Sequence, residues 1–111
     1  LIATKHKLNN LIIIIDYNKI QALSKLEDAL PLDNLSNKLR AFNCEIINIQ
    51  NGHSFKNLIS AFKKNKSKKP RVIIANTIKG KGIKEFENDP VWHARKLQGK
   101  EIEIGRKRLL K

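Results

Sequence analysis

The stretch "LIIIIDYNKI", residues 11–20, decides the fold. Its first five residues, Leu11 to Ile15, are all aliphatic, and polar residues follow at once. A short continuous apolar run of this kind predicts a strand that is apolar on both faces, as in the centre of a parallel sheet. The segment from Asp16 to Ile20 should therefore be the loop that directly follows a central strand.

Two further strands are expected at residues 44–50 and 71–76. A helix is expected between the first two strands, with Pro31 in its first turn and one apolar face. The residues of that face are Leu32, Leu35, Leu39 and Phe42. A second helix should follow Ser54, which can cap it. Its predicted apolar face comprises Phe55, Leu58, Ile59 and Phe62.

The order strand, helix, strand, helix, strand predicts an α/β fold with a parallel sheet, flanking helices and right-handed crossovers. A last helix is expected between Gln98 and Leu110. Ligands of such sheets bind beyond the carboxyl ends of the strands. Three loops should meet there: the one containing Asn18, the turn at residues 51–54, and the loop "NTIKGKG" at residues 76–82.

Composition excludes several classes of protein. The chain has 111 residues, 41% of them hydrophobic, so it can form a core. No apolar run approaches the roughly 20 residues of a membrane span. Cys44 is the only cysteine, which fits a reducing compartment and a cytosolic location. The chain has no methionine and begins with Leu1, so we expect a fragment or a processed piece of a longer protein.

The net charge of +13 raises the alternative of a small basic nucleic-acid-binding protein. The lysines are scattered, however, apart from the run at residues 63–69, which has the pattern of a solvated loop. A chain rich in Ile, Asn and Lys throughout also fits a coding sequence rich in A and T. The charge alone therefore favours a solvated surface over a nucleic-acid site.

Each candidate motif has a structural alternative. The Asn18 side chain and the Ile20 carbonyl offer hard oxygen ligands for Mg²⁺ or Ca²⁺, but an Asn after a strand is more often a turn residue. The glycines and lysines of residues 77–82 could approach a phosphate or form a flexible basic loop. His93, beside the only tryptophan, is either catalytic or structural.

Taken together, the blocks "NNLIIIIDYNKIQAL", "LRAFNCEIINIQNGHSF", "IIANTIKGKG" and "FENDPVWHARK" resemble successive parts of transketolase, in its thiamine-diphosphate-binding N-terminal region. The resemblance is collinear and runs from about Lys7 to about Lys96. It implies that residues 1–111 are the C-terminal half of that domain. The family's upstream Gly-Asp-Gly motif is not in this sequence.

The resemblance also implies roles for five residues. Asn18 and the Ile20 carbonyl match ligands of the Mg²⁺ that holds the diphosphate of thiamine diphosphate. His93 matches the active-site histidine. Lys79 and Arg95 stand where some members have basic residues of the cofactor site. Ser24, the "FNC" at residues 42–44 and Ala94 depart from the usual family pattern, although Asn43 can adopt the left-handed conformation of the usual glycine.

The implied activity is two-carbon ketol transfer between sugars by a transketolase-like enzyme, and the end of the chain favours a sugar or surface-polysaccharide pathway. The family activates the cofactor with a glutamate from another domain across a dimer. We therefore expect the missing domains or a partner subunit, with a homodimer for the whole enzyme. The isolated chain is expected to be inactive. The other interpretation that remains open is a diverged, non-catalytic fragment.

Overall fold

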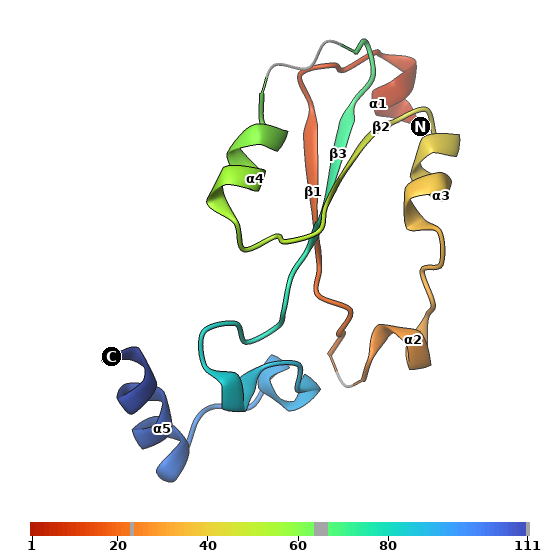
Figure 1. Cartoon of the computed structure of the whole chain (residues 1–111). Helices are drawn as coiled ribbons and strands as arrows, with labels where there is room; N and C mark the ends of the chain where they lie inside the picture. The colour runs from red at the N-terminus through yellow and green to blue at the C-terminus, as the bar shows by residue number, and fades with distance from the viewer. Residues whose placement is uncertain (23, 64–66, 111) are drawn as a thin grey trace. The chain divides into compact units, whose positions relative to one another are not determined.

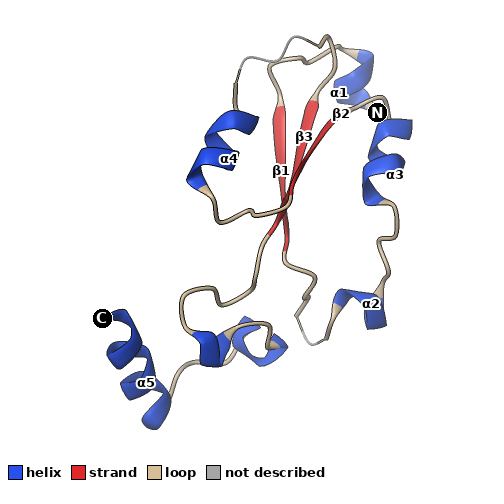
Figure 2. Cartoon of the chain, viewed as in Figure 1, coloured by secondary structure: helices blue, strands red, loops and turns tan. Residues whose placement is uncertain are grey.

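A three-stranded parallel sheet organises the first part of the chain (Figures 1 and 2). The strands β1 (Ile12–Tyr17) and β2 (Glu45–Ile49) each pair in parallel with β3 (Arg71–Asn76). The strand order is therefore β1-β3-β2. This confirms the predicted α/β fold and all three predicted strands: the bounds of β3 are the expected ones, and those of β1 and β2 differ by one or two residues.

The position of β1 corrects one expectation. The central strand of the described sheet is β3, whose first five residues are all buried. β1 lies at an edge, and the side chains of Ile13 and Ile14 are 41% and 53% exposed. Local pattern cannot distinguish a central from an edge strand when both are aliphatic, because strand order depends on which distant segments pair.

The structure is a computed structural model that describes residues 1–22, 24–63 and 67–110. It divides into two compact units. The first comprises Leu1–Tyr17 and Leu32–Thr77, and contains the whole sheet. The second comprises Asn18–Pro31 and Ile78–Lys111. Part of the lysine run predicted as a loop, residues 64–66, lies outside the described residues.

Five α-helices and two short 3₁₀ helices occur in the described ranges, and none is long and apolar enough to cross a membrane. They are α1 (Ile2–Lys5), α2 (Leu26–Ala29), α3 (Leu35–Ala41), α4 (Phe55–Ala61), η1 (Lys84–Phe86), η2 (Pro90–His93) and α5 (Lys100–Leu109). The terminal helix predicted from residue 98 onward is confirmed as α5.

The helix between β1 and β2 starts later than predicted. Pro31 and Leu32 precede α3, which begins at Leu35 after Asn34 in the left-handed conformation with φ 54°. The separate helix α2 lies in the connection between β1 and α3, where the sequence pattern predicted no helix. At the other end of α3, Asn43 has φ 62°, which confirms that this asparagine takes the left-handed conformation of a helix terminus.

The helices α3 and α4 cover opposite faces of the sheet (Figure 1). The connection from β1 to β2 and the connection from β2 to β3 run across the sheet in opposite directions. Right-handed crossovers in opposite directions place their helices on opposite faces. The core on the α4 side contains Ile49, Ala61 and Ile73, with Ile12, Ile47 and Leu58 packed around it.

The apolar face predicted for α4 is wrong in part. Leu58 packs against the core, but Phe55, Ile59 and Phe62 are 80%, 65% and 46% exposed. Ser54 caps the helix as predicted, because its side chain accepts a hydrogen bond from the Asn57 N–H at 3.4 Å. The short helix therefore turns a narrower apolar stripe toward the sheet than its sequence pattern indicates.

The buried side chain of Arg71 connects three elements at the amino end of the sheet. Its Nε donates a hydrogen bond to Glu45 Oε2 at 2.8 Å, at the start of β2. Its Nη1 donates to the carbonyls of Ala61 and Lys63, at 2.9 and 2.6 Å, where α4 ends. A buried guanidinium is tolerated because a carboxylate and two carbonyls accept its hydrogen bonds.

We expect Arg71→Ala to lower the free energy of unfolding by about 3 kcal/mol, because it leaves Glu45 and two carbonyls without their donor. Urea unfolding of the chain measures this change. The matched control is Arg40→Ala on the exposed surface of α3, for which we expect a change within about 0.5 kcal/mol. If Arg71→Ala lowered the free energy of unfolding no more than Arg40→Ala, the buried Arg71 guanidinium would not stabilise the fold.

In the second unit, aromatic packing organises the segment from Ile83 to Leu109. The rings of Phe86 and Trp92 lie 4.6 Å apart at 48°, and the Arg95 guanidinium lies 4.4 Å from the centre of the Trp92 ring. Gly105 of α5 is buried, and a Cβ there would lie 3.7 Å from Ile83 and 3.9 Å from Phe86. These contacts fasten α5 to the 3₁₀ helices.

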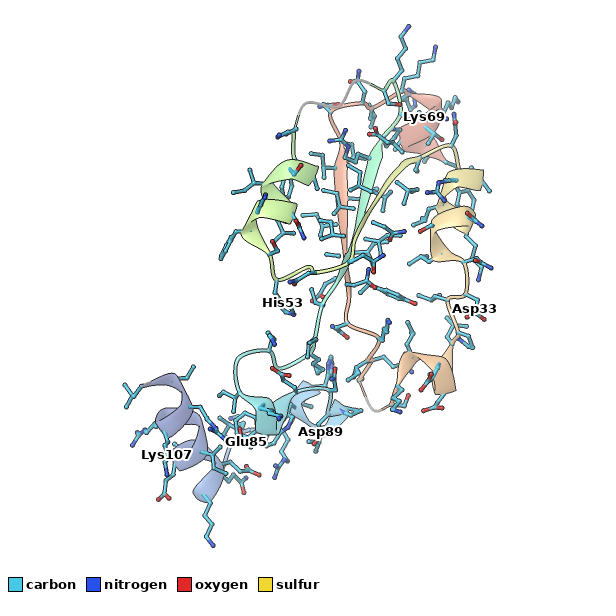
Figure 3. The ribbon with its side chains drawn as sticks, viewed as in Figure 1. Asp33, His53, Lys69, Glu85, Asp89 and Lys107 are labelled. Carbon is cyan, nitrogen blue, oxygen red and sulfur yellow. The ribbon has the colours of Figure 1, made fainter. Side chains whose placement is uncertain are left out.

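Two ion pairs support the same region. Arg108 of α5 binds Glu85 of η1, and its hydrogen bonds hold the pKa of Glu85 below the ordinary value of 4.5. Glu101 accepts hydrogen bonds from the Gln98 backbone N–H and from the Arg95 guanidinium, and these two in that order lower its pKa as well. Figure 3 shows Glu85 on η1 and Lys107 on α5.

These lowered pKa values predict how stability changes with pH. Because the folded pKa of each glutamate lies below its unfolded value, their contribution is complete above pH 4.5 and is lost as the pH falls through the folded pKa. The fluorescence of Trp92, the only tryptophan, reports on this region during urea unfolding at each pH. We expect Glu101→Gln to reduce the loss of stability below pH 4.5, and Glu103→Gln, an exposed control, to leave it unchanged.

Candidate cofactor site

The carboxyl end of β3 is fastened to the loop after β2. The Gly52 N–H donates to the Asn76 carbonyl at 2.7 Å, and the Asn76 side-chain amide donates to the Ile49 carbonyl at 3.0 Å. A Cβ on Gly52 would lie 2.7 Å from Thr77 Cγ2 and 2.8 Å from the Asn76 carbonyl oxygen. Only glycine fits this close approach of two backbones. In Figure 3, His53 lies in this loop.

The same end of β3 is fastened to β1. The Thr77 hydroxyl donates a hydrogen bond to the Asp16 carboxylate, and the Thr77 N–H donates to the Tyr17 carbonyl at 3.4 Å. The chain leaves the sheet immediately after these residues, at Asn18 and at Ile78. The two loops predicted to carry the cofactor ligands therefore start from a pair of strand ends held at a defined separation.

Asn18 forms a turn with its own loop. The Ile20 N–H donates to Asn18 Oδ1 at 2.9 Å, which is the hydrogen bond of an Asx turn. The alternative of a turn residue is thus correct for this side chain. A carbonyl oxygen has two lone pairs, so the turn leaves one for a metal ion. Metal binding by Asn18 stays a prediction.

The backbone around Ile20 is held by an isolated antiparallel bridge to Lys25. Its hydrogen bonds run from the Gln21 N–H to the Ser24 carbonyl at 3.0 Å and from the Leu26 N–H to the Lys19 carbonyl at 2.9 Å. Neither bond uses the carbonyl of Ile20. This oxygen, which the family resemblance identifies as a metal ligand, is therefore left outside the bridge.

The loop containing Lys79 is shaped by Gly80. The Lys79 carbonyl accepts a hydrogen bond from the Asn88 N–H at 2.9 Å, and Gly80 has φ 76°. A Cβ on Gly80 would lie 2.3 Å from the Phe86 carbonyl, so a side chain there would collide with η1. The loop is folded against η1, and the half-buried Lys79 sits at its base. Whether this loop binds a phosphate or is a flexible basic loop stays a prediction.

His93 ends η2 and its side chain is exposed. Asp89 caps this turn by accepting a hydrogen bond from the Val91 N–H at 3.0 Å, and Pro90 suits the first position after a cap. The preceding residue, Trp92, is packed against Phe86. The backbone that carries His93 is therefore anchored on one side while its imidazole remains accessible.

Arg95 has partners within the second unit. Its guanidinium binds Glu101 and lies over the face of Trp92, as described above. These contacts stabilise the turn between η2 and α5. A direct contact of Arg95 with the cofactor stays a prediction. The contact of Arg95 with Trp92 was not predicted, and the only sign of it in the sequence is that the two residues are three positions apart.

All five predicted site residues belong to the second unit: Asn18, Ile20, Lys79, His93 and Arg95. The described residues contain no group of three or more His, Cys, Asp or Glu side chains that could hold a metal ion. The oxygens that the loop after β1 offers are neutral amide and carbonyl oxygens. Such oxygens suit Mg²⁺ or Ca²⁺ when a carboxylate joins them.

Sequence reasoning did not foresee an open cavity of about 340 Å³ in the first unit, on the face of the sheet covered by α3. Polar side chains at the carboxyl ends of the strands line it, including Asn48, Gln50 and Asn76. The Asn48 side chain donates to Ser36 Oγ at 2.7 Å across the cavity wall. The alternation of Asn48 in β2 and Gln50 directly after it was the available signal.

Comparison with known proteins identifies the family. The family model for the thiamine diphosphate binding domain of transketolase matches residues 1–110. The chain is 39% identical over 105 residues to one of the subunits of the apulose-4-phosphate transketolase of Actinobacillus succinogenes, in an alignment that covers 94% of this chain and 38% of that protein. It is 38% identical over 93 residues to a 6-deoxy-6-sulfo-D-fructose transketolase subunit of a Clostridium species, covering 82% of this chain and 34% of that protein.

Among solved structures, the transketolase of Campylobacter jejuni is similar, with a TM-score of 0.84 and 31% identity over 96% of this chain and 17% of that one. The chain thus spans less than half the length of each of these relatives. The family model covers residues 1–110 and the structural match covers 96% of the chain, and both include the motifs named above. The chain belongs to the transketolase family, within its thiamine-diphosphate-binding domain.

Proposed function

We propose that residues 1–111 are the C-terminal half of a transketolase N-terminal domain, and that they bind the diphosphate and Mg²⁺ of thiamine diphosphate in a transketolase-like transferase. The observation that carries this proposal is the pair of ordered loops after β1 and β3, within the segment that the family model matches. The reaction class that follows is two-carbon ketol transfer between sugars.

In this proposal Asn18 Oδ1 and the Ile20 carbonyl are two of the Mg²⁺ ligands. The fit rests on the remaining lone pair of Asn18 Oδ1 and on the Ile20 carbonyl that the bridge leaves unused. Both oxygens belong to one short loop, whose conformation the Asx turn and the bridge hold. The carboxylate that a Mg²⁺ site needs would come from the Gly-Asp-Gly motif outside this sequence.

The remaining roles fall to side chains near the reacting groups. When bound, thiamine diphosphate supplies the nucleophile that attacks the ketose and stores the electrons of the transferred fragment. His93 would donate a hydrogen bond or proton to developing oxyanions, which its exposure permits. Lys79 would neutralise phosphate charge. To bind the cofactor as well, the Arg95 guanidinium would have to reach beyond its partner Glu101.

Relatives whose names describe transketolase subunits support a divided enzyme. We propose that the domain that activates the aminopyrimidine lies on another part of the protein or on a partner subunit, and that the whole assembly is a cytoplasmic homodimer or a dimer of such pairs. The names of the relatives include a sugar phosphate and a sulfo-sugar, so a phosphorylated or otherwise anionic sugar is the substrate class.

A second candidate is a diverged fragment without catalytic function. The observation in its favour is that Asn18 Oδ1 and the Arg95 guanidinium both have partners inside the chain. The two candidates predict different behaviour of the complete enzyme when Asn18 or His93 is replaced.

We expect Asn18→Ala in the complete enzyme to weaken Mg²⁺-dependent binding of thiamine diphosphate at least tenfold, measured by calorimetry, while Asn18→Asp retains binding because it keeps an oxygen ligand. The isolated 111-residue chain should bind the cofactor poorly, because it lacks the carboxylate ligand. Calorimetry that shows tight Mg²⁺-dependent binding by the isolated chain would contradict this.

The control for Asn18→Ala is Ser67→Ala. Ser67 forms a comparable turn, since its Oγ accepts the Lys69 N–H at 3.2 Å, and it lies in the connection before the amino end of β3. Loss of a turn alone would therefore affect both variants alike. Unchanged cofactor affinity in Asn18→Ala, or an equal loss in Ser67→Ala, would remove Asn18 from the metal site.

We expect His93→Ala in the complete enzyme to lower kcat by ~10²–10⁴, the usual contribution of an acid, base or oxyanion donor, with cofactor affinity nearly unchanged. Steady-state kinetics and thermal unfolding of the same variant measure this. His6→Ala replaces another exposed histidine and should leave kcat unchanged. A loss of activity that matches the loss of folded protein would assign His93 a structural role instead.

A further inference from the structure

The dipeptide Asn51-Gly52, in the loop after β2, is chemically reactive in an unfolded chain. Asn51 is the only asparagine of this sequence that glycine follows. Because glycine has no Cβ, its backbone nitrogen can approach the side chain of the preceding asparagine with little steric hindrance. That nitrogen can then attack the carbon of the side-chain amide, which is the first step in the conversion of asparagine to aspartate or isoaspartate.

In the folded chain, both reacting groups have other partners. The Gly52 N–H donates to the Asn76 carbonyl at 2.7 Å, and Gly52 is buried. The exposed side chain of Asn51 is held in a turn, because its Oδ1 accepts the His53 N–H at 3.0 Å. The Gly52 nitrogen must lose its proton to attack. A buried N–H that is bonded to a carbonyl is protected from the base that would remove this proton.

Neighbouring contacts keep Gly52 in this position. The carbonyl that accepts its N–H belongs to the last residue of β3, Asn76, whose side-chain amide also donates to the Ile49 carbonyl at 3.0 Å. The space around Gly52 is so limited that a Cβ would lie 2.8 Å from the Asn76 carbonyl oxygen and 2.7 Å from Thr77 Cγ2. The loop must therefore separate from the end of β3 before the Gly52 nitrogen can react.

We propose that Asn51 is a deamidation site that the fold protects, and that it reacts only when the loop after β2 separates from the end of β3. In this reaction the Gly52 nitrogen bonds to Asn51 Cγ, and the side-chain amide nitrogen leaves as ammonia with the proton of the Gly52 N–H. Water then opens the resulting succinimide at either of its carbonyls. The products are aspartate and isoaspartate, and water is the only co-reactant.

Formation of isoaspartate makes the separation of the loop permanent. In isoaspartate the Cβ of residue 51 belongs to the main chain, so the connection between β2 and Gly52 becomes longer. Gly52 has no room for the resulting shift, because Thr77 and the Asn76 carbonyl lie too close to it. The loop of the isoaspartyl chain therefore cannot restore its hydrogen bond to the end of β3.

The test incubates the 111-residue chain and a synthetic peptide of residues 41–56 at the same mildly alkaline pH. The peptide lacks β3 and cannot form the hydrogen bond from Gly52. Trypsin releases the same peptide from the chain, and tandem mass spectrometry locates the added mass. We expect Asn51 to deamidate at least tenfold more slowly in the folded chain than in the peptide. Asn51→Gln should abolish the product in both, because a glutamine side chain would have to close a larger ring.

Two asparagine-to-alanine substitutions test whether the end of β3 controls the reaction. Asn76→Ala removes a side-chain hydrogen bond to the end of β2 and leaves Asn51 and Gly52 unchanged. It should raise the deamidation rate of Asn51 and the amide exchange rate of Gly52 by the same factor, at least threefold, because one opening exposes both groups. The matched control is Asn48→Ala, which removes a hydrogen bond of 2.7 Å to Ser36 of α3 and should change neither rate.

The proposal is overturned if the folded chain deamidates as fast as the peptide, if the peptide does not react, or if the added mass lies at another asparagine. It is also overturned if Asn76→Ala, shown to be folded by circular dichroism, reacts no faster than the parent chain or Asn48→Ala. If Asn76→Ala does not fold, the comparison of the parent chain with the peptide decides. No cofactor or substrate is present, so the result is independent of the proposed function.

Discussion

The structure of the first unit depends on the buried guanidinium of Arg71. At the first position of β3 it binds the carboxylate of Glu45 and the carbonyls of Ala61 and Lys63, and so joins β2, β3 and the end of α4. The alternative to these bonds is a buried positive charge without acceptors, which costs several kcal/mol. A single side chain therefore sets where the second and third strands begin relative to each other.

The opposite end of the sheet is held by smaller contacts. Gly52 lets the loop after β2 approach β3, and Thr77 connects β3 to Asp16 of β1. The ordered strand ends fix the starting points of the loops that carry Asn18 and Lys79. The candidate ligands are backbone and amide oxygens in the loops that follow these strands along the chain.

In the second unit, side-chain contacts hold the turn that precedes the exposed His93. Trp92 contacts both Phe86 and Arg95, and the ion pairs of Arg95 and Arg108 attach α5 to the same turn. His93 directly follows the half-buried tryptophan, so its backbone is fixed while its imidazole is exposed. Arg95, which lies over the ring of Trp92 and pairs with Glu101, therefore stabilises this turn.

The sequence by itself determined the three strands, their parallel arrangement, the Ser54 cap and the left-handed Asn43, because these follow from local pattern and backbone preference. Its ordered motifs also determined the family. Tertiary structure decided that β3 is central, that α4 buries Leu58 rather than Phe55, and that Arg95 lies on Trp92. These features depend on pairing and packing between segments, which local preferences do not encode.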